Sequence, residues 1–533
     1  VTALYLLTIA ILAVWSIHLV FKHDFKVFHT PLDIPIVAYI FIFIISSAIS
    51  INPIVSLFGT YKRFEGLAPT LCYIILFYIT INFVTTQKRL YLLIIAIAAG
   101  ATITSIYGIA QHLGFDIFKW SAFESRRVFS TFGNPVFFSA YLVMTLPIAI
   151  VLFFNNSAQE RKAHISKNPH SLWTFFVLSS IIYTTFWLTN TRACFVALLG
   201  GLTPLLFLIS KKQTIERYKF VVTVVSFVLI GIFFNIRDET SVIKHFVSDM
   251  GTTSPSVPPL LKESAEGLPI SSKIQTHQRP WIANKLDVHA SSFSRLFQYL
   301  AATKIIKDYP ALGIGPDTIG IVYQKYLAKV YSLLESDGGF LYPRQDRIHN
   351  DILDTAVTRG IFGLGTYIWL LTAFSVYVGK NYKRLNNQNK ILILGVLAGI
   401  LCYLIQSEFS FGNTPIVTLF WVMMGLCISI IKINETEGLL STEGVSKIEG
   451  CYEDRKLRGW EGGKTGSAQL PSFPPSQIPV FCKWIGCGVV LTAMGFATVF
   501  VLRFYRADAY FEYGRRILDY EKENLPAITE KGL

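Results

Sequence analysis

The sequence predicts an all-α membrane protein: a polytopic helix bundle of about twelve transmembrane helices with one large helical extracytoplasmic loop. The chain of 533 residues is 52% hydrophobic and only 15% charged, whereas a soluble protein carries about 25% charged residues. Its apolar residues come in blocks of about 18–22 residues, which are long enough to cross a hydrocarbon core as helices. The blocks lack the two-residue alternation that is typical of barrel strands.

The predicted spans lie near residues 1–21, 34–52, 67–84, 90–110, 135–154, 171–189, 192–210, 218–235, 361–379, 391–409, 414–431 and 480–503. Basic residues such as Lys211 and Lys383 gather in alternate connections, which the positive-inside rule assigns to the cytoplasm. The remaining connections, including the one between residues 236 and 360, are then extracytoplasmic. The net charge of +14 is therefore a topology signal and does not indicate nucleic-acid binding.

The pattern of spans and polar stretches predicts the domain organisation. An N-terminal transmembrane bundle covers residues 1–235, and an extracytoplasmic loop covers 236–360, with a flexible insertion at about 251–290 that is rich in turn-forming residues. Further core helices cover 361–432, a cytoplasmic linker 433–478 and a last transmembrane helix 479–503. The tail at 504–533 is an extracytoplasmic helix. It fits either the start of a tetratricopeptide-like repeat or a plain juxtamembrane helix.

The second half of the extracytoplasmic loop is predicted to be ordered. An amphipathic helix begins near Ser292 and ends before Pro310, and a second one runs near residues 319–334. Gly313 and Gly315 between them indicate a turn rather than a nucleotide-binding loop, because the strand–turn–helix setting of such a loop is missing.

His349 is the candidate catalytic residue. It lies in the run Arg347-Ile-His-Asn-Asp351, just before a predicted span. An imidazole is close to neutral at working pH, so it can take the proton of an attacking hydroxyl. The alternative is a surface histidine at a helix start.

Arg192, Arg295 and Arg63 are candidate anion-binding residues, because they are predicted at the outer ends of spans or in the outer loop, against the positive-inside bias. A guanidinium group binds phosphate through two parallel hydrogen bonds. Several such groups around one cleft would hold a diphosphate leaving group. The alternative for each of them is an arginine that reaches lipid headgroups.

Four further residues are expected to support the site. Asn350 or Asp351 would orient the histidine, Arg347 adds a cation beside it, and Glu408 is a carboxylate near the outer end of its span. Glu408 would pair with an arginine, help to activate an acceptor, or have a structural role. The acidic residues lack the spacing of metal-dependent glycosyltransferases, so we expect no metal and no cofactor.

Several short segments together resemble the O-antigen ligase superfamily, which includes O-antigen polymerases and bacterial protein O-oligosaccharyltransferases. The resemblance comes from their order around one large outer loop. The matching segments are residues 56–66, 107–111, 130–135, 191–193, 294–316, 348–351 and 360–364. The insertion, the linker and the last span lie outside the common core of that superfamily.

The resemblance implies a metal-independent inverting enzyme in the bacterial inner membrane, with its active site on the extracytoplasmic face. Such an enzyme transfers a glycan from undecaprenyl-diphosphate to an acceptor hydroxyl on a glycan, lipid or protein. His349 would match the base of the family, and Arg192, Arg295 and Arg63 would match its diphosphate-binding arginines. The alternatives are a polysaccharide polymerase, a transporter of a lipid-linked sugar or small anion, and a membrane scaffold.

Overall fold

The structure is a computed structural model. It describes residues 1–22, 29–60, 63–116, 127–155, 170–210, 217–236, 290–332 and 347–442, and some positions between 488 and 503. Within these residues all regular secondary structure is helical, which confirms the predicted all-α class. The N-terminal helices are α1 (Thr2–Lys22), α2 (Asp33–Ala48), α3 (Pro53–Phe58), α4 (Leu67–Phe83), α5 (Gln87–His112), η1 (Ser130–Phe132), α6 (Pro135–Phe154), α8 (His170–Leu188), α9 (Arg192–Ser210) and α10 (Arg217–Ile236). The later helices are α14 (Ala290–Asp308), α15 (Ile319–Ser332), α16 (Asp351–Tyr382), α17 (Asn387–Ser407) and α18 (Thr414–Thr442).

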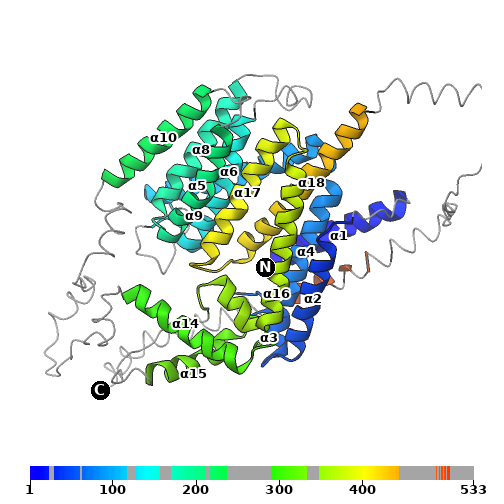
Figure 1. Cartoon of the computed structure of the whole chain (residues 1–533), viewed down its shortest axis with the longest axis vertical. Coiled ribbons are helices and arrows are strands. Elements are labelled where there is room, and N and C mark those ends of the chain that lie inside the picture. Colours follow the sequence, from blue (N-terminus) through cyan, green and yellow to red (C-terminus); the bar gives the residue numbers. More distant parts are fainter. Residues whose placement is uncertain are drawn as a thin grey trace, which may run out of the picture. The chain divides into compact units, whose positions relative to one another are not determined.

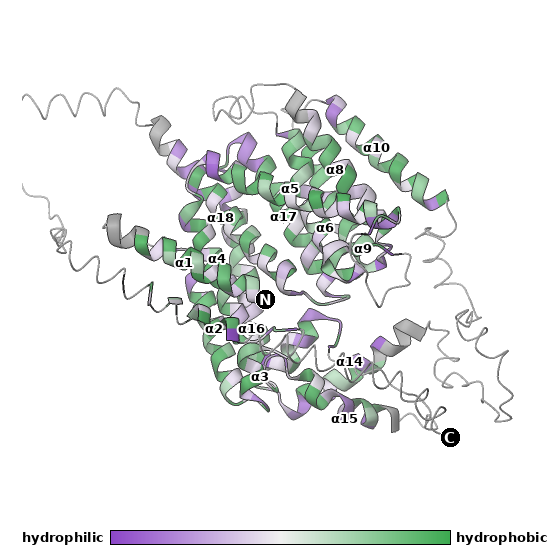
Figure 2. Cartoon of the chain, turned by 180° about the vertical axis from the view of Figure 1, so that it is seen from behind, coloured by the Kyte–Doolittle hydropathy of each residue, from purple (hydrophilic) through white to green (hydrophobic). Residues whose placement is uncertain are grey.

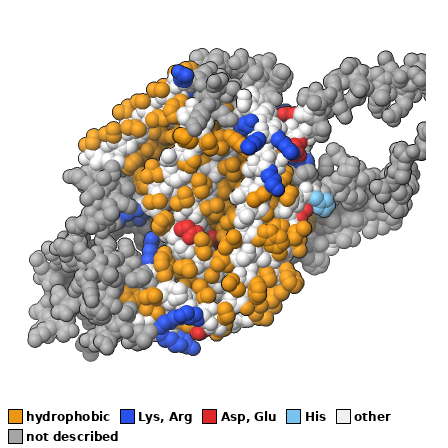
Figure 3. Space-filling model, in the orientation of Figure 1, with side chains coloured by type: hydrophobic (Ala, Val, Ile, Leu, Met, Phe, Trp, Pro, Cys, Tyr) orange, Lys and Arg blue, Asp and Glu red, His pale blue; other side chains and the backbone are white. Residues whose placement is uncertain are grey.

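Seven of the described helices are long and apolar enough to cross a membrane: α5, α6, α9, α10, α16, α17 and α18. The apolar helices α1, α2, α4 and α8 are shorter by the same measure. Figure 2 shows these helices coloured mostly as hydrophobic along their length, and the face in Figure 3 is broadly hydrophobic with Lys and Arg mainly towards its margins. The protein is therefore a multi-pass membrane protein. The count of twelve spans stays a prediction.

The chain divides into two compact units. The smaller unit contains Val1–His29, Pro69–Leu76 and the chain from Leu440 onwards, and the larger contains Thr30–Ala68 and Phe77–Leu439. All the candidate site residues belong to the larger unit, so its architecture decides how they are placed.

A close-packed bundle forms the centre of the larger unit. Helix α17 packs against α6 and α9, while α8 packs against α5, α6 and α10 (Figure 1). Glycines on α17 allow this approach, because a Cβ added at Gly399 would lie 2.3 Å from the carbonyl oxygen of Met144. One added at Gly395 would lie 2.3 Å from Val151 Cγ2. Small residues at such contacts are the usual means of close helix packing in membranes.

The segment predicted to be the ordered part of the extracytoplasmic loop has a small hydrophobic core of its own, the outer core. Helices α14 and α15 pack against each other, and α14 also packs against α16 (Figure 1). Their buried residues meet Ile348 and Val357, which come from the start of α16 and the chain before it. The core residues are Phe297, Ala301, Ala302, Ile305, Ile314, Ile319, Tyr323, Tyr326, Leu327, Val330, Ile348 and Val357. Both predicted amphipathic helices are thus present.

Two glycines fix the junction between this outer core and the bundle. Gly315 has φ +105, and a Cβ there would lie 1.9 Å from Ser50 Oγ, so the turn at 313–317 packs directly on the connection between α2 and α3. Gly360 has φ 65 and interrupts α16, so residues 351–359 form a separate helical piece ahead of the long span. The span predicted to begin near residue 361 therefore begins at this break.

Several predictions concern residues outside the described ones. These are the insertion at 251–290, the tail at 504–533 and most of the linker and the last span. The helix α18 continues to Thr442, past the boundary at 432 that the sequence predicts.

Candidate functional site

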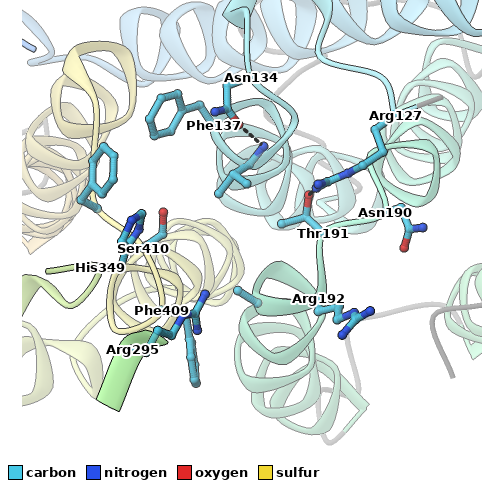
Figure 4. Close-up of a pocket in the computed structure, with 13 residues that line it drawn as sticks. Arg127, Asn134, Phe137, Asn190, Thr191, Arg192, Arg295, His349, Phe409 and Ser410 are labelled. Carbon is cyan, nitrogen blue, oxygen red and sulfur yellow. Dashed lines mark hydrogen bonds between the residues drawn. The ribbon is translucent and has the colours of Figure 1, made fainter. Parts of the chain in front are cut away.

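A cavity of about 510 Å³ lies where several helix ends of the larger unit meet (Figure 4). Its walls come from the start of α6, the turn before α9, the helix α14, the residue before the α16 cap, and the connection between α17 and α18. The lining residues are Arg127, Asn134, Val136, Phe137, Asn190, Thr191, Arg192, Ala193, Arg295, His349, Phe409, Ser410 and Phe411. The structure thus places His349, Arg192 and Arg295 around one cavity.

Three arginines contribute the positive charge of the cavity. Arg192 is the first residue of α9, Arg295 lies in α14, and Arg127 precedes η1. Figure 4 shows Arg127 and Arg192 on one side and His349 on the other, with Arg295 close to Phe409. Among the described residues that line the cavity there is no aspartate or glutamate. The cavity is therefore suited to bind an anion.

Arg127 is the lining arginine that sequence reasoning did not select. Its Nε donates to the carbonyl oxygen of Thr189 at 2.9 Å, and its Nη2 donates to Thr191 Oγ1 at 2.9 Å. Burial lowers the pKa of Arg127; the nearby Cys194 raises it and Arg192 lowers it further. The sequence held a weak signal, since Arg127 precedes a predicted span on the outer side. Its link to the turn before α9 could not be seen without the fold.

Two helices begin at the cavity wall. Asn134 caps α6 by accepting from the Val136 N–H at 2.8 Å, and α9 begins at Arg192. A helix N-terminus carries a partial positive charge from its aligned peptide dipoles and has unpaired N–H groups. Both features add to the attraction that the three arginines exert on an anion.

His349 lies across the cavity with an unusual backbone. Its φ is 58, in the left-handed region that residues with a Cβ rarely adopt. Its ring centroid is 5.3 Å from that of Phe411. Ile348, immediately before it, is fully buried in the outer core. The backbone directly before His349 is therefore anchored in the outer core, and this anchor holds the histidine at the cavity wall.

Asn350 links the histidine segment to the opposite wall. Its Oδ1 accepts from the Leu353 N–H at 2.9 Å and caps α16. Its Nδ2 donates to Glu408 Oε2 at 2.9 Å and to the carbonyl oxygen of Glu408 at 3.2 Å. Since Glu408 directly precedes the lining residues Phe409–Phe411, this pair connects the two parts of the wall.

Arg347 is buried in an ionic network. Its Nη1 donates to Asp354 Oδ2 at 2.7 Å, and its Nη2 donates to Asp317 Oδ1 at 2.8 Å and to Glu65 Oε2. Asp317 Oδ2 in turn accepts from the Thr60 and Glu65 N–H groups at 2.6 and 3.2 Å. Three carboxylates from three separate segments therefore surround one guanidinium group.

Five predicted site residues are not among those that line the cavity: Arg347, Asn350 and Glu408, described above, and Arg63 and Asp351. The guanidinium carbon of Arg63 lies 4.4 Å from the ring centroid of Phe411, on which it stacks. Phe411 itself lines the cavity. Asp351 Oδ2 accepts from the hydroxyl of Tyr367 at 3.3 Å, and no described contact of Asp351 shows it orienting the histidine. Among the described residues there is no group of three or more His, Cys, Asp or Glu side chains that could hold a metal ion.

Comparison with known proteins gives one family. Residues 174–368 match a family model described as O-Antigen ligase. A search of curated proteins gave no match. The matched region contains His349, Arg192 and Arg295, which the structure gathers at the cavity. Arg127 and Phe411 also line the cavity but lie outside the matched region. Residues 174–368, a little over a third of the chain, are thus similar to the O-antigen ligase family.

Proposed function

We propose that the protein transfers a glycan from a polyprenyl diphosphate, such as undecaprenyl diphosphate, to an acceptor hydroxyl with inversion at the anomeric carbon. The observation that carries this proposal is the composition of the cavity wall. Arg127, Arg192 and Arg295 line it together with His349, without a carboxylate among the described lining residues. The similarity of residues 174–368 to the O-antigen ligase family model supports a donor of this kind.

Each part of the site has a role in the proposed reaction. The imidazole of His349 takes the proton from the acceptor hydroxyl. The acceptor oxygen forms a bond to the anomeric carbon as the bond from that carbon to the phosphate oxygen breaks. The electron pair leaves with the diphosphate, whose added negative charge the three guanidinium groups stabilise. The proton then passes from the imidazole to water.

The transfer takes place on the extracytoplasmic face of the bacterial inner membrane in this proposal. The cavity forms at the starts of α6, α9 and α16 and after the end of α17. The charge pattern of the connections predicts that all these helix ends face outwards. The first part of α16 and the helices α14 and α15 would then form the outer loop domain over a bundle of about twelve spans.

The test is transfer in vitro by the purified protein in detergent, with a synthetic polyprenyl-diphosphate glycan as donor and a chelator present. We expect His349→Ala to lower turnover by about 100- to 10,000-fold, which is the range that general base catalysis supplies. Arg384→Lys is the matched control, because Arg384 is exposed and lies in a predicted cytoplasmic connection. The monodispersity of each variant shows that the fold is retained.

The outcome separates the rival functions. Full transfer by the His349→Ala variant would remove the proposed base. Uptake of the intact lipid-linked glycan by vesicles, without cleavage of the diphosphate, would favour a transporter. Supplying a second lipid-linked glycan as acceptor in place of a lipid or protein distinguishes a polymerase from a ligase.

A further inference from the structure

We propose that Arg347, held by Glu65, Asp317 and Asp354, is a positioning residue that fixes the backbone of His349 and so aims its imidazole into the cavity. This inference rests on the proposed role of His349 as the base. It adds Arg347 and three carboxylates, none of them among the cavity-lining residues, as the groups that position His349. Two of them, Asp317 and Asp354, are at most 9% exposed at the side chain, and Glu65 is 18% exposed.

The strain at His349 is the first reason. A left-handed φ at a residue with a Cβ is unfavourable by about 1–3 kcal/mol and persists only where the surroundings determine it. The residue has φ 58, so its neighbours must hold it. Arg347 is bound by three carboxylates, Ile348 is buried in the outer core, and Asn350 caps α16. The residues on both sides are thus fixed independently.

The origin of the three carboxylates is the second reason. Glu65 comes from the connection between α3 and α4, Asp317 from the turn before α15, and Asp354 from the first piece of α16. The guanidinium group therefore joins three segments that are far apart in sequence. Its fork of N–H groups matches carboxylates at several angles, which a lysine ammonium group cannot reproduce.

The third reason is the balance of charge. Burial raises the pKa of Glu65 to about 8; Arg347 opposes the rise, while Asp317 and Asp354 add to it and Arg63 opposes it more weakly. At neutral pH Glu65 is then mostly a neutral acid within this network. As the pH rises through about 8, Glu65 ionises and adds a negative charge to the network. Burial, Asp317 and Asp354 disfavour that charge, so the network around Arg347 should rearrange there although the attraction between Glu65 and Arg347 increases.

The experiment compares variants of the full chain in the transfer assay across pH 6 to 9. Glu65→Gln cannot ionise, so we expect it to lack the loss of kcat that the unmodified protein shows as the pH rises through about 8. Arg347→Lys should lower kcat by about 100-fold with little change in KM for the donor, because misplacing a catalytic group acts mainly on the chemical step. Arg384→Lys is the control for both.

A second readout needs no transfer activity. The rate at which diethyl pyrocarbonate modifies His349, followed by peptide mass spectrometry, reports how that imidazole is presented. We expect the rate to change by about threefold or more in Arg347→Lys, and to stay close to that of the unmodified protein in Glu65→Gln at pH 7.

The results separate this inference from the proposed function. An alkaline loss of kcat that persists in Glu65→Gln overturns the role of Glu65, and an unchanged kcat together with an unchanged modification rate in Arg347→Lys overturns the positioning role. If His349→Ala retains full transfer while Arg347→Lys still changes the modification rate of His349, the positioning holds and the proposed base fails. Should Arg347→Lys not fold, the pH profile of Glu65→Gln decides.

Discussion

The cavity wall and the Arg347 network use the same side chain in opposite surroundings. Arg127, Arg192 and Arg295 line a cavity that has no carboxylate among its described lining residues, whereas Arg347 is bound by three. The described wall of the cavity therefore carries positive charge and can attract an anion. The charge of Arg347 is already compensated within the protein, so it can act only through what it holds.

Replacing the two kinds of arginine by methionine should give the largest contrast. Arg347→Met removes the guanidinium group that pairs with the buried Asp317 and Asp354, and breaking a buried ion pair in this way destabilises by about 3–5 kcal/mol. Arg192→Met removes a half-buried cation, so we expect stability within about 0.5 kcal/mol of the unmodified protein. It should instead lower kcat/KM by about 100-fold, as the loss of a charge-stabilising donor does. Thermal unfolding in detergent and the transfer assay measure both.

An equal loss of stability in the Arg347→Met and Arg192→Met variants would contradict the different roles assigned to the two arginines. A useful companion is Arg192→Lys, which keeps the charge and loses the planar fork. If the fork matters for a diphosphate, its kcat/KM should fall between those of the methionine variant and the unmodified protein.

The link between Asn350 and Glu408 should show an intermediate effect. Asn350→Asp keeps an oxygen that can cap α16 but loses the N–H group that donates to Glu408. It also brings two carboxyl groups together, and losing a hydrogen bond to a charged group costs about 1.5–3 kcal/mol. We expect a lower unfolding temperature and about tenfold lower kcat, because the two parts of the cavity wall are no longer tied together.

A second substitution tests this link directly. Adding Glu408→Gln to Asn350→Asp supplies an amide donor from the other side, so the pair can form again with its direction reversed. Recovery of stability and turnover in the double variant supports the link. Additive losses would show that the two residues act separately.

The sequence predicted the parts of the molecule that depend on local pattern. Apolar block length indicated the helices, and the positive-inside rule brought His349, Arg192 and Arg295 to one predicted side. The sequence could not predict the Arg347 network, because Glu65 and Arg347 lie far apart along the chain, with most of the predicted spans between them. The sequence could not reveal the role of Gly315 either, since a Cβ there is excluded by Ser50 in the distant connection between α2 and α3. Contacts between distant segments follow from tertiary packing, which periodicity does not encode.

Replacing Arg63 is expected to have the smallest effect. It tests whether a contact that the sequence did not predict, with Phe411, decides the role of this residue. The sequence suggested a diphosphate ligand, but its guanidinium group stacks on Phe411 and is not among the residues that line the cavity. A cation–π contact of this kind contributes about 0.5–1 kcal/mol at a partly exposed site, so Arg63→Gln should lower kcat/KM only about two- to fivefold. Phe411→Leu in the same background should lower kcat/KM further, because the Phe411 ring also contacts His349 and lines the cavity. A loss as large as that of Arg192→Met would instead make Arg63 a ligand of the donor and require it to reach past the Phe411 ring.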